Sequence, residues 1–135
     1  MNLRLNIYSS IIFVIWFTSS CKNDKAKMAL PAVTCNTPAV VSFKNDLQPL
    51  FGQYCTTAGC HTGNSPQGNL NLEPSVAYAM LMNKSKGYVD TVNPGYSLLY
   101  AQMTSASQPM PPTGNLKQCQ LDLVMKWIQQ KAKNN

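Results

Sequence analysis

The sequence predicts a small all-α domain of about four helices, which spans residues 42–135. Apolar side chains in the segments 47–54 and 121–128 recur at the spacing that places them on one face of a helix. No part of the chain shows a convincing pattern of sheet strands. The residues that carry the helical spacing are Leu47, Leu50, Phe51 and Tyr54 in the first segment and Leu121, Val124, Met125 and Ile128 in the second, with Trp127 on the flank.

The first predicted helix covers residues 47–54. Asp46 is placed to cap its N-terminus, and Pro49 is tolerated because it falls in the first turn. A polar loop at residues 62–69 separates this helix from a short second helix, which we expect near residues 76–82.

The second half of the domain begins with an irregular stretch, residues 84–93. A third helix is expected to start near Tyr96 and to include Met103 on its packed face. The last helix has the clearest pattern of the four, and we expect Asn115 to cap it.

The most informative motif lies at the end of the first predicted helix. Cys55 and Cys60 are separated by four small residues, and His61, the only histidine of the chain, follows directly. Two cysteines followed by histidine form the attachment signature of c-type haem, which usually has a two-residue spacer. Each thiol adds to a haem vinyl group, and the imidazole becomes the proximal iron ligand. The motif therefore predicts one covalently bound haem c.

A zinc site or a disulfide is the competing interpretation of this motif. A closed structural zinc site needs four ligands. With a single histidine in the chain, the remaining ligands would have to include Cys35 or Cys119.

A second iron ligand is predicted in the proline-rich stretch at residues 108–114. Met110 stands among prolines that exclude a helix and stiffen the loop, so its thioether can be held against the open face of the iron. Ligation by histidine and methionine raises the reduction potential. Met103 is the rival ligand, although its helical spacing favours core packing. In the remaining interpretation, Met110 lies in an exposed polyproline-like loop.

The N-terminus predicts export from the bacterial cytoplasm. Residues 1–20 contain Arg4 and then an apolar run that is too short to span a bilayer, which is typical of a signal peptide. Small residues precede Cys21 as in a lipoprotein signal, which predicts that Cys21 is acylated and becomes the first mature residue. In the alternative interpretation, cleavage is ordinary and Cys21 is an idle thiol. Residues 21–41 are predicted to be a flexible tether.

Two cysteines remain after these assignments, Cys35 and Cys119. In an oxidising envelope compartment we expect them to form a disulfide, and two free thiols are the alternative.

The charge of the chain excludes one class of partner. The formal net charge is +6, but the only arginine is Arg4, inside the signal peptide, and the lysines are scattered. Bidentate phosphate and guanine recognition is therefore absent, and nucleic acid is not an expected partner. A mildly basic surface is suited to acidic redox proteins.

Four sequence segments together resemble the planctomycete-type cytochrome c-like domain of secreted bacterial lipoproteins, including those of Bacteroidetes. The resemblance covers about residues 42–132. It rests on four stretches of sequence, namely 43–51 before the haem motif, 92–100, Met110-Pro111-Pro112 and 126–128. It implies a class I cytochrome c fold, in which about four helices wrap around the haem, with Cys55, Cys60, His61 and Met110 as haem-binding residues.

These observations together predict a monohaem cytochrome c that transfers single electrons between donor and acceptor proteins of the bacterial cell envelope. It would be membrane-anchored through lipid and would not be an enzyme, because iron with both axial positions filled has no vacant site for a small-molecule substrate. The alternatives are a haem-containing sensory or accessory module of an enzyme complex, a peroxidase-like haem enzyme, and a zinc-bound structural domain.

Overall fold

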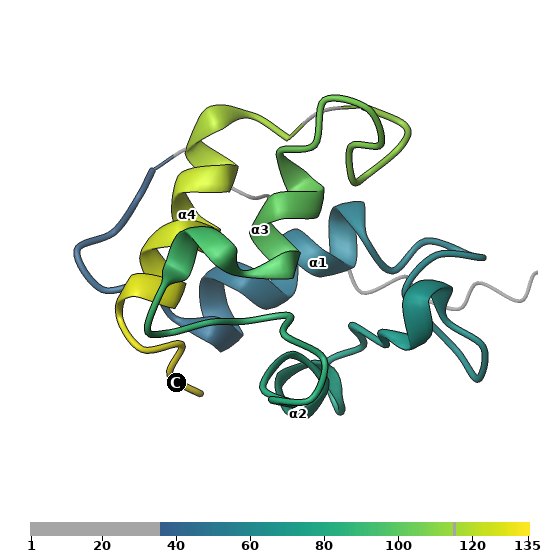
Figure 1. Ribbon diagram of the computed structural model, residues 1–135, viewed down its shortest axis with the longest axis horizontal. Helices are drawn as coiled ribbons and strands as arrows, with labels where there is room; N and C mark the ends of the chain where they lie inside the picture. The colour runs from purple at the N-terminus through teal and green to yellow at the C-terminus, as the bar shows by residue number, and fades with distance from the viewer. Residues whose placement is uncertain (1–35, 115) are drawn as a thin grey trace, which may run out of the picture.

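The computed structural model describes residues 36–114 and 116–135. Within these ranges the chain is helical and contains no strand, so the predicted all-α class is confirmed. The predicted signal peptide, Cys21, Cys35 and Asn115 lie outside the described residues. The elements in chain order are η1 (Phe43–Leu47), α1 (Gln48–Tyr54), η2 (Gln67–Asn69), α2 (Ala77–Leu81), η3 (Pro94–Tyr96), α3 (Leu98–Met103) and α4 (Gln118–Gln129) (Figure 1).

The first helical segment begins earlier than predicted, because a π-helical turn, η1, precedes α1. The Ser42 hydroxyl accepts a hydrogen bond of 3.1 Å from the amide of Asn45, and Asp46 Oδ2 accepts one of 2.7 Å from the amide of Ser42. The predicted cap at Asp46 is therefore wrong. Ser42 caps the segment, and Asp46 reaches back to it in the manner of a capping box.

The last helix, α4, begins after Lys117 rather than at a cap on Asn115. The side chain of Gln120 turns back, and its Oε1 accepts a hydrogen bond of 2.8 Å from the Lys117 amide. This bond satisfies one of the backbone groups that a helix N-terminus leaves without a partner.

The C-terminal end of α4 is closed by two residues with positive φ, Lys131 (70°) and Ala132 (47°). The Ala132 amide donates a hydrogen bond of 2.9 Å to the carbonyl of Trp127. Helices often end in a chain reversal closed by a bond of this kind. This reversal brings the Lys133 carbonyl to the indole, whose Nε1 donates to it at 2.9 Å. Trp127 is 0% exposed. Its predicted place on the flank of the helix is therefore wrong.

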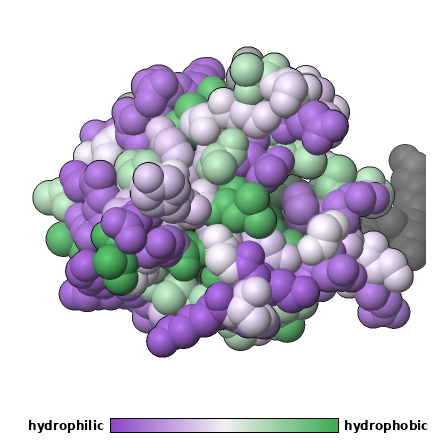
Figure 2. All heavy atoms as spheres, in the orientation of Figure 1, coloured by the Kyte–Doolittle hydropathy of each residue, from purple (hydrophilic) through white to green (hydrophobic). Residues whose placement is uncertain are grey.

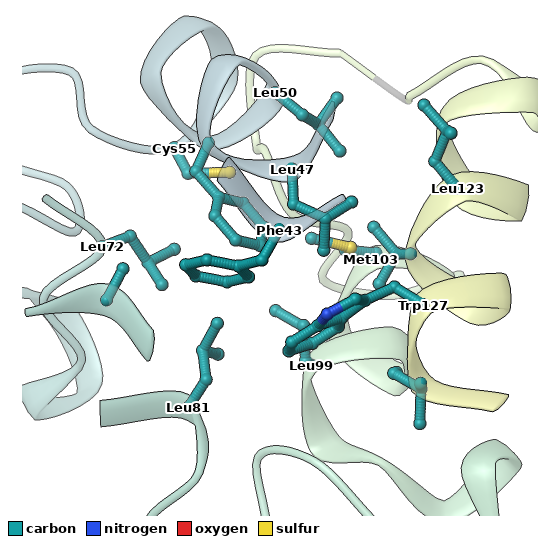
Figure 3. Packing of buried hydrophobic residues seen from close by; sticks show 14 of the residues in the cluster. Phe43, Leu47, Leu50, Cys55, Leu72, Leu81, Leu99, Met103, Leu123 and Trp127 are labelled. Atoms are coloured by element: carbon teal, nitrogen blue, oxygen red, sulfur yellow. The ribbon is translucent and has the colours of Figure 1, made fainter. Parts of the chain in front are cut away.

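The core lies where α4 packs against α3 and η1. Phe43 is its aromatic centre, with ring centroids 5.2 Å from Tyr78, 5.3 Å from Trp127 and 6.2 Å from Phe51. Figure 3 shows the apolar side chains of α1, α3 and α4 converging on this region, with Leu47 near its middle.

The chain is already packed before residue 42, inside the stretch predicted as a tether. Val41 is 1% exposed, and its amide donates a hydrogen bond of 3.0 Å to Gln130 Oε1. Gln130 Nε2 donates in turn to the Ala39 carbonyl at 2.8 Å. The end of the predicted tether is therefore hydrogen-bonded to the residue that follows α4.

Among the helices of the described ranges, none has both the length and the apolar character that crossing a bilayer requires.

Candidate functional site

The predicted motif residues lie together in one closed turn at the end of α1. The Cys55 amide donates to the Phe51 carbonyl at 2.7 Å and completes the last turn of the helix. Gly59 has a φ of 80°, which reverses the backbone, and the His61 amide then donates to the Cys55 carbonyl at 3.0 Å. The four-residue spacer therefore folds into a compact loop that brings both cysteines and the histidine to one end of the helix.

Cys55 and Cys60 are both free thiols, but their surroundings differ. Cys55 is 8% exposed, and Figure 3 shows its sulfur directed toward the core. Burial raises the pKa of the Cys55 thiol to about 12, with a smaller contribution from charge repulsion by Cys60. Cys60 is half-buried, and the Thr57 hydroxyl donates a hydrogen bond of 3.1 Å to its sulfur. Neither sulfur is in a disulfide, but Cys55 is shielded by the core, whereas Cys60 is partly accessible.

His61 is held from two sides by the segment that follows the polar loop. Its Nδ1 lies 3.1 Å from the Leu70 carbonyl oxygen, and its own carbonyl accepts a hydrogen bond of 2.9 Å from the Leu72 amide. The tautomer protonated on Nδ1 donates to Leu70 and leaves the Nε2 lone pair available. Within the described part of the chain, Nε2 makes no hydrogen bond. Metal-binding histidines typically show this arrangement, with one nitrogen fixed by a carbonyl and the other facing the metal.

A hydrogen-bond network next to His61 fixes the segment that holds it. Glu73 accepts bonds from the Thr62 hydroxyl (2.7 Å) and from Asn71 Nδ2 (2.9 Å). These two bonds lower the pKa of the Glu73 carboxyl. Asn71 Nδ2 also donates to the Gly63 carbonyl at 3.1 Å. The network therefore ties the residue after His61 to the segment that supplies the Leu70 carbonyl.

The two candidate methionines occupy different environments. Met103, at the end of α3, is 5% exposed, and Figure 3 shows it among core side chains near Leu47 and Trp127. Its predicted packing role agrees with this burial. Met110 is half-buried in the loop that follows α3, and its amide donates to the Gln102 carbonyl at 3.0 Å. No hydrogen bond in the described ranges connects the Met110 loop with the 55–61 turn, so their approach across a haem stays a prediction.

The sulfur and nitrogen groups of this region are of the types that bind a covalently attached haem. Two free thiols flank a turn that ends in a histidine with an available Nε2, and a thioether side chain sits on a loop fixed to α3. Thr57, Leu70 and Glu73 support the site, and their supporting roles are not predictable from the sequence. Thr57 was visible only as a small spacer residue, and a backbone carbonyl such as that of Leu70 leaves no signal in sequence.

The remaining cysteines bear on the zinc interpretation. Cys119 lies in the first turn of α4 and is disulfide-bonded. Its predicted partner, Cys35, lies outside the described residues, as does Cys21, so the pairing and the lipidation stay predictions. In residues 36–114 and 116–135, no group of three or more histidine, cysteine, aspartate or glutamate side chains is arranged to hold a metal ion.

Comparisons of this chain with models of protein families, with curated proteins and with solved structures give no match. The family that the sequence resembles therefore stays a prediction.

Proposed function

We propose that this protein is a monohaem c-type cytochrome that transfers single electrons in the bacterial cell envelope. The observation that carries the proposal is the hydrogen bond between His61 Nδ1 and the Leu70 carbonyl, within a turn that presents two free thiols. A zinc-bound structural domain is less well supported, because Cys119, one of its two possible additional ligands, is already in a disulfide.

Each residue of the site has a distinct role in this proposal. Cys55 and Cys60 would hold the haem through thioether bonds, and His61 Nε2 and the Met110 sulfur would bind its iron. The bound haem supplies iron that is oxidised and reduced by one electron. The Leu70 carbonyl orients the imidazole and increases its basicity, which strengthens it as a ligand. Cys55 is buried, so the thioether proposed there would lie against the apolar core.

The proposed location follows from the N-terminal sequence. A signal peptide and an acylated Cys21 would anchor the protein in the cell envelope, on the periplasmic side or at the outer membrane. There it would exchange electrons with donor and acceptor proteins. The resemblance of residues 42–132 to the planctomycete-type cytochrome c-like domain supports the same interpretation.

The decisive experiment produces the full chain together with a bacterial c-type haem maturation system. We expect intact-mass analysis to show one haem per chain and a pyridine haemochrome spectrum typical of two thioether bonds. A variant with Cys55→Ser and Cys60→Ser is the matched control and should lack covalent haem. Protein that matures without haem would refute the proposal, and stoichiometric zinc in that material would support the structural-domain alternative.

A further inference from the structure

The end of the connection between α2 and α3, together with the first residue of α3, displays large apolar side chains to solvent. Val92 is 81% exposed, Tyr96 is 84% exposed and Leu98 is 40% exposed, whereas the neighbouring Ser97 and Leu99 are 0% and 6% exposed. The chain therefore buries a serine hydroxyl and leaves an aromatic ring and two aliphatic side chains outside. Grouped exposure of this kind marks an interaction site more often than isolated exposed residues do.

The hydrogen bonds of this loop hold its shape without help from the exposed side chains. Asp90 Oδ1 accepts hydrogen bonds from the amides of Val92 (2.8 Å) and Asn93 (2.9 Å), which lower the pKa of the Asp90 carboxyl. The buried Ser97 hydroxyl accepts a bond of 2.9 Å from the Asp90 amide and so joins the two ends of the loop. A loop fixed in this way presents its apolar side chains in a preformed arrangement, so little conformational entropy is lost on binding.

Two lysines lie beside the loop. Lys131 Nζ donates a hydrogen bond of 3.0 Å to the Thr91 carbonyl, so its aliphatic stem runs up to the loop. Lys86 is exposed and precedes Gly87, whose carbonyl accepts a bond of 3.1 Å from the Leu98 amide. The loop's only carboxylate already accepts hydrogen bonds from its own backbone. Asp90 keeps its negative charge, so the two lysines against this one carboxylate leave a small positive excess beside the apolar tips.

We propose that residues 90–98 form a docking loop that inserts its apolar tips into the headgroup region of an anionic lipid bilayer. Tyrosine and aliphatic side chains suit the membrane interface, and lysines nearby are attracted to anionic headgroups. This inference rests on the proposed function in one respect, because it assumes the lipid anchor at Cys21. The chain between Cys21 and the first described residue can extend no further than roughly 50 Å, so a lipidated Cys21 would keep the domain near the membrane.

Two observations favour lipid over a protein partner. Hydrophilic side chains cover much of the face viewed in Figure 2, and only three exposed apolar side chains belong to the loop, far fewer than the about 20–30 residues that each partner typically contributes to a stable protein interface. In addition, Figure 1 shows that the 90–98 loop and the 55–61 turn lie toward opposite ends of the long axis of the molecule. Membrane contact through residues 90–98 would leave the proposed haem-binding end accessible to redox proteins.

The test uses the full mature chain with Cys21→Ser, so that no acyl group contributes, and sucrose-loaded vesicles of phosphatidylethanolamine and phosphatidylglycerol. We expect it to sediment with these vesicles, to bind pure phosphatidylcholine vesicles far less, and to dissociate as salt is raised. Val92→Ser with Tyr96→Ser should lower the partition coefficient by about tenfold. Val40→Ser with Val76→Ser, at two exposed valines elsewhere, is the matched control and should change it less than about twofold.

Two results would overturn the proposal: no sedimentation of the parent chain with anionic vesicles, or equal losses in the test and control variants. If the parent chain does not sediment, a protein becomes the better candidate for the partner that binds the loop. Thermal unfolding by circular dichroism establishes that all variants are folded. Vesicle binding does not require haem, so a chain that lacks haem but binds vesicles would refute the proposed function alone. A haem-loaded chain that does not bind vesicles would refute only the proposal that residues 90–98 dock on a bilayer.

Discussion

Gln120 on α4 donates a hydrogen bond of 3.0 Å from its Nε2 to the hydroxyl of Tyr54, the last residue of α1. Gln120 is 3% exposed, and its Oε1 also accepts the bond from the Lys117 amide. One buried amide therefore fixes the N-terminal turn of α4 and joins it to the end of α1, directly before Cys55. The residue that precedes the 55–61 turn is therefore held by the first turn of the last helix.

The Gln120–Tyr54 contact predicts a measurable coupling between the two helices. Gln120→Ala should lower the free energy of unfolding by about 2 kcal/mol, because it removes both hydrogen bonds of a buried amide. Tyr54→Phe should cost about 1 kcal/mol, and the double variant should reveal a coupling energy of about 1 kcal/mol in urea unfolding. Gln118→Ala, an exposed site on the same helix, is the control, and an equal loss there would contradict this role of Gln120.

Two variants of the matured protein test which methionine is the proposed second ligand of the haem iron. Met110→Ala should leave the protein folded but open the iron to carbon monoxide or cyanide. Met103→Ala should instead lower stability by about 2–4 kcal/mol, because it leaves a cavity in the core, and should not change ligand access. Visible spectra with and without carbon monoxide distinguish these outcomes. The reverse pattern would assign the ligand to Met103.

The two motif cysteines should react at different rates in the folded, haem-free chain. The thiolate is the reactive form, and a pKa raised to about 12 leaves very little Cys55 thiolate near neutral pH. Burial also shields the sulfur. With iodoacetamide, peptide mass spectrometry should find Cys60 modified well before Cys55. In concentrated urea the two rates should converge, and equal rates without urea would argue against the buried position of Cys55.

The Glu73 network predicts a stability that depends on pH. Its hydrogen bonds lower the pKa of Glu73 below its usual value of 4.5, so the folded state favours the carboxylate. The stabilisation is present above pH 4.5 and is lost as the pH falls through the lowered value. Glu73→Gln should therefore unfold at lower urea concentration at pH 7, and the difference from the parent chain should shrink toward pH 3. Asp122→Asn is an exposed control on α4. A difference that stayed constant with pH would contradict the carboxylate's role.

The positive φ of Lys131 in the reversal after α4 predicts that glycine is more stable than alanine at this position. Lys131 has a φ of 70°, a conformation that costs a residue with a side chain roughly 1 kcal/mol and that glycine adopts freely. Lys131→Gly should therefore be more stable than Lys131→Ala by about 1 kcal/mol, since both variants lose the bond to Thr91. Thermal unfolding of the pair measures the difference. An alanine variant as stable as the glycine variant would show that the backbone there is not strained.

The sequence alone determined the features that depend on neighbours along the chain. The helical class followed from the spacing of apolar residues such as Leu47 and Leu50, and the proximity of Cys55, Cys60 and His61 followed from their few intervening residues. Helix periodicity and a short spacer act over one or two turns, so the pattern of residues is sufficient to predict them.

Only the tertiary structure decided the features that join distant segments. It gave His61 the Leu70 carbonyl, placed Trp127 inside the core and left Tyr96 outside it. Each outcome depends on which backbone groups and surfaces meet after folding. A carbonyl is present at every residue, and an aromatic side chain suits both a core and an interface. The physical reason is that burial and hydrogen-bond pairing are properties of the assembled chain rather than of any local stretch.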